Sequence, residues 1–104
     1  MRRFGQIARL KPDKVEEYDR LHAAVWDEVL KTIRECNLRN YSIYRKGNLL
    51  FAYFEYTGTD YEADMAKMAA DPLTQKWWTY THPCFEQERD GEFYTDMKEL
   101  FHID

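Results

Sequence analysis

Apolar residues recur along the chain with two different periods, which predicts both helices and strands. Helical spacing runs over residues 13–36, where Pro12-Asp13 opens the segment and acidic side chains suit its first turn. Aromatic and β-branched residues on either side of Gly47-Asn48 predict a hairpin. The expected order is strand 2–10, helix 13–36, strands 39–46 and 48–58, helix 61–70, a short helix after Pro72 and a final strand at 98–104.

This β-α-β-β-α-β order predicts an α+β protein with the ferredoxin-like split βαβ fold, in which two helices cover one face of a four-stranded antiparallel sheet. The length of 104 residues and the absence of linker-like segments predict one domain over residues 1–104. Strand 48–58 carries apolar residues on both faces, so the outer face also needs a cover. We expect a symmetric homodimer, a dimeric α/β-barrel with antiparallel sheets packed face to face. The alternative is a sheet that curls around its own C-terminal segment.

Charge and composition exclude several classes of function. The net charge is -4 and the basic residues are scattered, which argues against binding to nucleic acid. No apolar run has the length of a membrane span or a signal peptide, so we expect a cytoplasmic protein without membrane contact. Cys36 and Cys84 lack the spacing of a metal or redox motif, and we interpret both as buried thiols.

A histidine lies within the apolar stripe of the long predicted helix. The stripe consists of Val15, Tyr18, His22, Val25, Val29 and Ile33. Imidazole titrates near pH 6.5, so a histidine facing the sheet can accept or donate a proton at neutral pH. The structural alternative is a core histidine that is hydrogen-bonded to a backbone carbonyl, and the helix alone favours that alternative.

Two adjacent tryptophans occur in the segment "DPLTQKWWTYTHPCF". Successive helical residues point about 100° apart, so we expect one of Trp77 and Trp78 to support the core and the other to line a cleft. Flat aromatic faces accept the C–H face of a sugar ring, while tyrosine hydroxyls and a histidine supply directed polar contacts. Simple packing is the more common role of such a pair.

Five segments together resemble the L-rhamnose mutarotase family across essentially the whole chain: "EEYDRLHAAVWDE", "NYSIY", "NLLFAYFE", "DPLTQKWW" and "ELFHID". The resemblance implies a dimeric α/β-barrel that interconverts the α and β anomers of L-rhamnose and needs no cofactor or metal. The proton donor of the family falls on His22. Its substrate-contacting residues fall on Tyr18, Tyr41, Trp77 and Trp78.

The chain departs from the family pattern beside the expected site. Ala23-Ala24 follows the histidine where the family commonly has Asn-Pro, and Asp27 replaces a proline. A related 6-deoxy sugar such as L-fucose is therefore an alternative substrate. His82 and His102 have no metal-ligand spacing with His22, and we interpret them as surface or packing residues.

Acid–base ring opening and reclosure would exchange the anomers, with His22 protonating the ring oxygen. The sequence leaves the group acting at the anomeric hydroxyl open among Tyr18, Tyr41, a carboxylate and water. The same fold and an aromatic cavity would also suit a small monooxygenase, or a non-catalytic dimeric module that binds a sugar.

Overall fold

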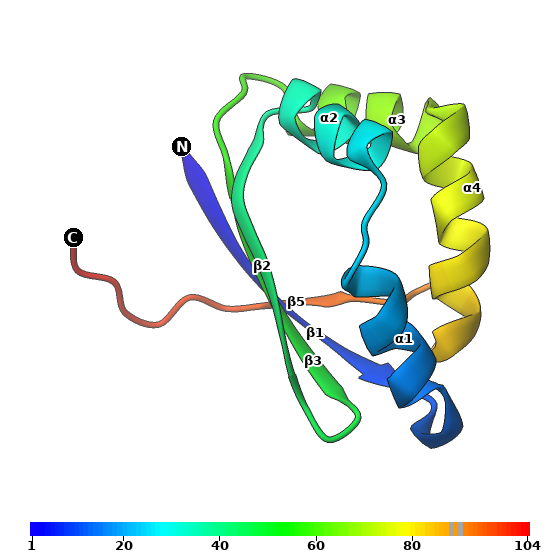
Figure 1. Cartoon of the computed structure of the whole chain (residues 1–104). Helices are drawn as coiled ribbons and strands as arrows, with labels where there is room; N and C mark the ends of the chain where they lie inside the picture. Colours follow the sequence, from blue (N-terminus) through cyan, green and yellow to red (C-terminus); the bar gives the residue numbers. More distant parts are fainter. Residues whose placement is uncertain (88, 90) are drawn as a thin grey trace.

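The computed structural model describes residues 1–87, 89 and 91–104 (Figure 1). Helices lie on one side of a curled sheet, and the C-terminal segment leaves from the other side. The elements, in chain order, are β1 (Arg2–Leu10), the 3-10 turn η1 (Pro12–Lys14), α1 (Val15–His22), α2 (Asp27–Glu35), β2 (Leu38–Lys46), β3 (Leu49–Tyr56), α3 (Tyr61–Ala70), α4 (Pro72–Thr81), the 3-10 turn η2 (His82–Cys84), β4 (Phe85–Glu86) and β5 (Thr95–Met97).

The sheet is antiparallel, with the order β2-β3-β1-β4, and β5 pairs with β1 on the same edge as β4. A two-residue turn connects β2 to β3, and Gly47 has a φ of +59°, a left-handed value that glycine adopts without steric cost. This arrangement confirms the predicted α+β, ferredoxin-like class. The hairpin is also confirmed.

The core lies between the helices and the facing side of the sheet. Every second side chain of β3 from Leu50 to Tyr56 is buried, and Ala8 and Leu10 of β1 are buried beside them. Tyr18 of α1 and Phe85 of β4 belong to the same buried cluster as Leu10 and Leu50. Cys36 and Cys84 are free thiols with no more than 1% of their surface exposed, which confirms the interpretation of both as buried.

The single helix predicted over residues 13–36 is wrong. The structure has two helices, α1 and α2, separated by an extended connection (Figure 1). Trp26 has a ψ of 138°, and its ring packs edge-on against Trp77 and Tyr80 of α4. Local composition alone allows a continuous helix, but packing of a large aromatic ring against α4 redirects the chain, and Asp27 then suits the first turn of α2.

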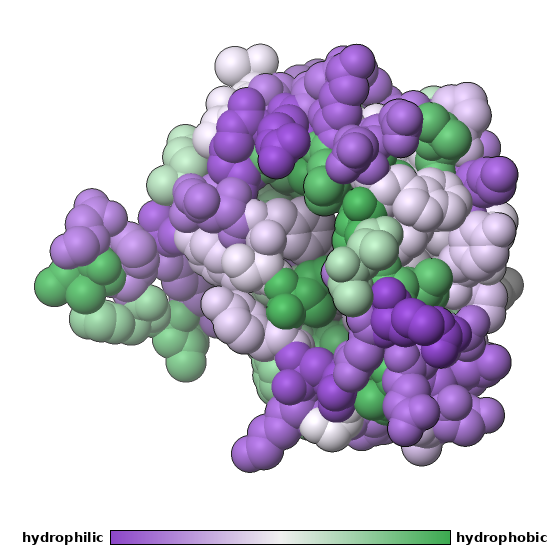
Figure 2. Space-filling view, in the orientation of Figure 1, coloured by the Kyte–Doolittle hydropathy of each residue, from purple (hydrophilic) through white to green (hydrophobic). Residues whose placement is uncertain are grey.

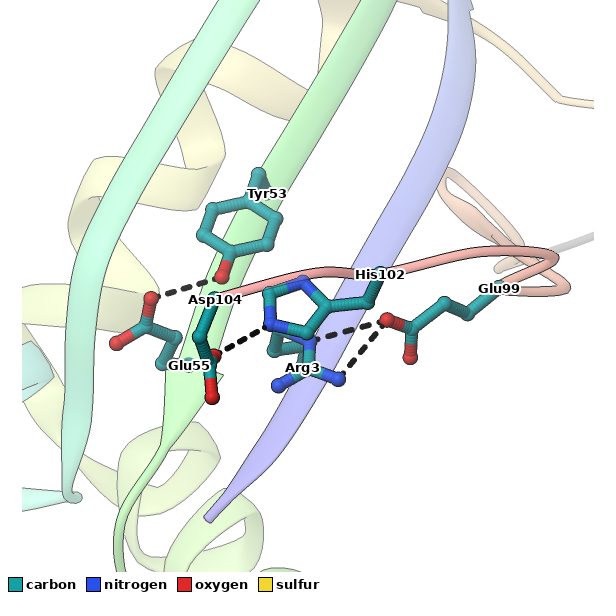
Figure 3. Close-up of polar contacts among 6 residues, drawn as sticks. All are labelled: Arg3, Tyr53, Glu55, Glu99, His102 and Asp104. Carbon is teal, nitrogen blue, oxygen red and sulfur yellow. Dashed lines mark hydrogen bonds and ion pairs between the residues drawn. The ribbon is translucent and has the colours of Figure 1, made fainter.

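The final strand predicted at residues 98–104 is also wrong. The edge of β1 is occupied earlier in the chain, by β4 and by β5. Beyond Met97 the segment crosses the side of the sheet away from the helices, where Arg3 donates a 3.0 Å hydrogen bond to Glu99 (Figure 3). Three apolar side chains of this segment have no core to enter and are 78–87% exposed: Leu100, Phe101 and Ile103.

Within the residues that the structure describes, no helix is both long and apolar enough to span a bilayer.

Candidate active site

A cavity of about 1110 Å³ lies between the helices and the curled sheet. Ligand sites in proteins commonly have volumes of roughly 300–1,000 Å³, so the space accommodates a small organic molecule. Both halves of the predicted helical stripe reach this cavity although the helix is broken: Tyr18, His22, Val25, Val29 and Ile33 line it. The stripe was therefore predicted correctly, whereas the continuity of its helix was not.

His22 is the last residue of α1 and lies beside two aromatic rings. Its imidazole stacks on Tyr18 at 4.0 Å between ring centroids and meets Trp77 edge-on at 5.5 Å. His22 Nδ1 is 3.0 Å from the backbone oxygen of Tyr18. A carbonyl oxygen only accepts hydrogen bonds, so Nδ1 carries the proton that it donates. Nε2 is then a proton acceptor when the ring is neutral and a donor when it is charged.

Burial lowers the pKa of His22 below its ordinary value of 6.5, because the charged ring loses solvation. The hydrogen bond to Tyr18 and the nearby charge of Asp19 oppose this shift, since both favour the protonated ring. The neutral form of His22 consequently predominates near pH 7.

Tyr18 and Tyr94 form a pair of hydroxyl groups on the cavity wall, with 3.2 Å between their oxygen atoms. Burial raises the pKa of both phenols well above the ordinary value of 10. Both hydroxyls therefore stay protonated near neutral pH and act as hydrogen-bond partners. Sequence reasoning identified Tyr18 but missed Tyr94, which lies before β5 and lacks a helical or strand pattern that places it beside α1.

Tyr41 reaches the cavity because β2 contains a bulge. Two residues, Asn40 and Tyr41, stand opposite one residue of β3 between the Arg39–Glu55 and Ser42–Tyr53 pairs. The extra residue shifts the alternation of side chains, so Leu38 and Tyr41, which are three residues apart, both line the cavity. Asn40 takes a left-handed φ of +51°, which asparagine tolerates better than most residues.

The Tyr41 ring packs against Phe54 at 5.4 Å, and 37% of its surface is exposed. The phenol group is nevertheless surrounded closely enough that desolvation raises the pKa of Tyr41 well above its ordinary value. Like Tyr18, it holds its proton near neutral pH.

Trp77 and Trp78 lie on α4, which begins with a well-formed cap. The Asp71 carboxylate accepts 2.8 Å hydrogen bonds from the backbone and hydroxyl groups of Thr74, and Pro72 occupies the first turn. Trp77 is only 6% exposed, whereas Trp78 is partly exposed, and both line the cavity. Trp77 therefore serves both core and cavity, instead of the two tryptophans dividing these roles.

His82 follows Trp78 by one helical turn and also lines the cavity. Its imidazole stacks on Trp78 at 5.2 Å and on Phe93 at 3.9 Å, and it meets Phe85 edge-on at 6.4 Å. These contacts confirm the interpretation of His82 as a packing residue. Its position on the cavity wall was not predicted. The spacing of four residues from Trp78 is the sequence signal that would have indicated it.

An ion pair fastens α1 to β2 behind His22. Arg45 donates to both carboxylate oxygens of Asp19, at 2.7 Å from Nε and 2.6 Å from Nη2. This bidentate geometry fixes orientation as well as distance. The hydrogen bonds from the Arg45 guanidinium lower the pKa of Asp19, so Asp19 is ionised near neutral pH.

The cavity thus combines aromatic walls with a few directed polar groups. His22 can exchange a proton, and three tyrosine hydroxyls can orient a ligand without titrating near neutral pH. Among the described residues, no three histidine, cysteine, aspartate or glutamate side chains are grouped as metal ligands. The arrangement is that of a site for acid–base chemistry on a small, partly apolar molecule.

Comparison with known proteins identifies the family. The sequence profile described as L-rhamnose mutarotase matches residues 3–103. An L-rhamnose mutarotase of Oceanobacillus iheyensis is 35% identical over the full length of both chains, and one of Phocaeicola vulgatus is 37% identical over 91% of each. The crystal structure of L-rhamnose mutarotase FA22100 from Formosa agariphila has the same fold, with a TM-score of 0.80, 20% identity and complete coverage of both chains.

The fold and the cavity make the chain a small α+β protein with an aromatic site. The chain belongs to the L-rhamnose mutarotase family. Membership confirms the resemblance found in the sequence segments. It also argues against the monooxygenase alternative, because the match to the family extends over nearly the whole chain and is not restricted to the fold.

Proposed function

We propose that this protein interconverts the α and β anomers of L-rhamnose by acid–base ring opening and reclosure, with His22 as the proton donor. The observation that carries the proposal is the placement of His22: Nδ1 donates to Tyr18, and the ring lies 5.5 Å from Trp77 on the wall of the cavity. The family of the chain supports the same reaction.

The residues around His22 supply the other requirements of the reaction. Opening of a pyranose needs a proton at the ring oxygen, and reclosure returns it, so a group near its own pKa suits both directions. The aromatic surfaces of Trp77 and Trp78 provide a wall for the apolar face and the methyl group of a 6-deoxy sugar. Tyr18 and Tyr41 offer hydrogen bonds to sugar hydroxyls, and their retained protons fix them as partners near neutral pH.

The test is NMR magnetisation exchange between the two anomeric proton signals of a sugar, with catalytic amounts of protein. A panel of L-rhamnose, L-fucose, D-glucose and D-galactose separates specificity from activity. Faster exchange of L-rhamnose than of the other sugars is the expected result. Preference for L-fucose would reassign the substrate to another 6-deoxy sugar. Binding without exchange would assign the chain as a non-catalytic sugar-binding module.

We also propose that the chain forms a homodimer through the outer face of the sheet. Strand register places Tyr44, Phe51 and Met97 on that face, and they are 66%, 37% and 42% exposed. The C-terminal segment crosses the same face and extends beyond the body with several apolar side chains (Figure 2). A second copy would cover the sheet and the segment of each chain together through one isologous contact.

Sedimentation at micromolar concentration tests this assembly. A species of twice the chain mass is expected, and a variant with Phe101→Asp and Ile103→Asp should shift toward the monomer. A folded wild-type chain that sediments as a monomer at every concentration would contradict the dimer.

The two buried free thiols support a further proposal, that the protein works in the reducing cytoplasm. Fractionation of cells expressing the full chain is the direct measurement.

A further inference from the structure

His82 is a second imidazole on the wall of the cavity that contains His22. It caps α4 and begins η2, and Pro83 restricts the backbone directly after it. Trp78 and Phe93 stack on its ring, which leaves the nitrogen-bearing edge as the part available for polar contact. Among the described residues, no group hydrogen-bonds to either ring nitrogen of His82. A titratable ring is thus held in place, and the described part of the chain does not use its hydrogen-bonding capacity.

We infer that His82 is the second proton-transfer group of the site, acting at the anomeric hydroxyl while His22 acts at the ring oxygen. This inference rests on the proposed function. His82, which the sequence predicted to be a surface or packing residue, then has a role in the reaction. The anomeric hydroxyl of the sugar would bind at the end of the cavity that His82 lines.

The other polar groups on the described wall are poorly suited to accept the anomeric proton. Tyr18, Tyr41 and Tyr94 already hold protons near neutral pH because burial raises the pKa of each. Glu92 is paired with Arg89 at 3.8 Å, and neither is enclosed. Burial lowers the pKa of His82 below its ordinary value of 6.5, so its neutral, proton-accepting form predominates near pH 7.

The proposed step balances with one proton shared between the two histidines. Neutral His82 takes the proton of the anomeric hydroxyl, and the electrons of that O–H bond form the C1 carbonyl. The bond from C1 to the ring oxygen breaks, its electron pair stays on that oxygen, and protonated His22 supplies the proton there. Rotation about C1–C2 follows. Reclosure reverses both transfers, so the protein ends with its original proton and no external reactant is consumed.

Charged and titratable groups approach His82 from several elements. Lys11 faces it across a shallow groove on the outside of α4, and Arg89, Glu92 and Tyr94 come from the segment before β5. Tyr18 and His22 face it across the cavity from α1. The exchange rate should rise as His82 becomes neutral and fall as His22 loses its proton, which gives a bell-shaped dependence on pH.

The deciding variant is His82→Phe, which keeps an aromatic ring between Trp78 and Phe93 but removes both nitrogens. Anomer exchange of L-rhamnose should fall at least about tenfold, with little change in the sugar concentration at half-saturation, and the acidic limb of the pH profile should disappear. His82→Gln, which keeps polarity but cannot accept a proton near pH 7, should fall similarly and serves if His82→Phe does not fold. His102→Phe, on the exposed C-terminal segment, is the matched control and should retain the wild-type rate.

A folded His82→Phe or His82→Gln variant with the wild-type rate and the wild-type pH profile overturns the inference while leaving the proposed function intact. A wild-type protein that exchanges no sugar anomers removes the proposed function itself, and the role of His82 with it.

Discussion

Two regions of the molecule place polar groups among aromatic rings. In one region the polar groups are hydrogen-bonded to one another, and in the other some of their hydrogen-bonding capacity is left for a ligand. In the corner between β3 and α3, Tyr56 donates to Asp64, accepts from the backbone of Asp60, and shares the Asp64 carboxylate with Asn37. In the cavity, His22 hydrogen-bonds to the backbone of Tyr18 through Nδ1 and has Nε2 available for a ligand.

The difference separates structure from function. A saturated network such as the Tyr56 corner stabilises one conformation, because each polar group is matched within the chain. The polar groups of the cavity retain hydrogen-bonding capacity at a buried location. A buried polar group without a partner destabilises the fold, and a ligand that hydrogen-bonds to it offsets this loss. Changes in the corner should therefore alter stability without altering chemistry, and changes to the polar groups of the cavity should do the reverse.

The substitution His22→Asn should have the largest effect on the exchange rate. Asparagine can still donate to the Tyr18 carbonyl, so the fold should persist, but it cannot exchange a proton near neutral pH. Anomer exchange should fall on the order of a hundredfold or more, while sugar binding largely remains. Exchange NMR measures the rate, and thermal unfolding checks the fold. A folded variant that exchanges anomers at the parent rate would make His22 a hydrogen-bonded core histidine and nothing more.

Gly58→Ala is the corresponding change in the corner. A Cβ at position 58 would clash with the Tyr56 hydroxyl and would lie 2.7 Å from an Asp64 carboxylate oxygen, so the network must shift. Overpacking of this kind costs about 1–3 kcal/mol of unfolding free energy. Chemical denaturation should show the loss, and the exchange rate of the folded protein should be unchanged.

Gly5→Ala is the matched control, because a Cβ there meets only the flexible end of Met97 at an ordinary 3.7 Å. Equal stability of the two alanine variants would mean that the corner network relaxes freely, and the contrast between the two regions would fail.

Substitution of each tryptophan separates its contact with sugar from its contribution to the core. Trp77→Phe removes part of a ring that contacts both His22 and Trp26, so affinity for sugar should weaken several-fold and stability should also fall. Trp78→Phe should affect stability less, since Trp78 is the more exposed. Titration calorimetry with L-rhamnose measures the affinities. Wild-type affinity and exchange rate in both variants would reduce the pair to packing.

Periodicity predicted the fold class and the part of the cavity wall that the helical stripe of α1 and α2 supplies, because strands alternate and helical stripes face the sheet whatever their length. It failed where distant packing decides the local structure. Trp26 lies in the connection between α1 and α2 and contacts Trp77 and Tyr80 of α4, which no spacing around residue 26 reveals. Leu38 and Tyr41 share a face only because Asn40 forms a bulge. Tyr94 and His82 join the site by long-range contacts, whereas His22 and Tyr18 are neighbours on one helix and were therefore predictable.

The smallest expected effect concerns the ion pair between Asp19 and Arg45. Replacing Asp19 and replacing Arg45 should shift the pKa of His22 in opposite directions. Asp19→Asn removes the carboxylate whose charge raises the pKa of His22, so that pKa should fall further. Arg45→Gln breaks the same pair but leaves the Asp19 charge without its compensating guanidinium, so the pKa of His22 should rise. NMR titration of the His22 ring protons measures both shifts, and exchange rates at pH 7 should change by less than about threefold. Either substitution removes the bidentate ion pair between α1 and β2. A purely mechanical role for the pair therefore predicts pKa shifts of one sign, and two shifts in the same direction would show that the pair does not act on His22 through its charges.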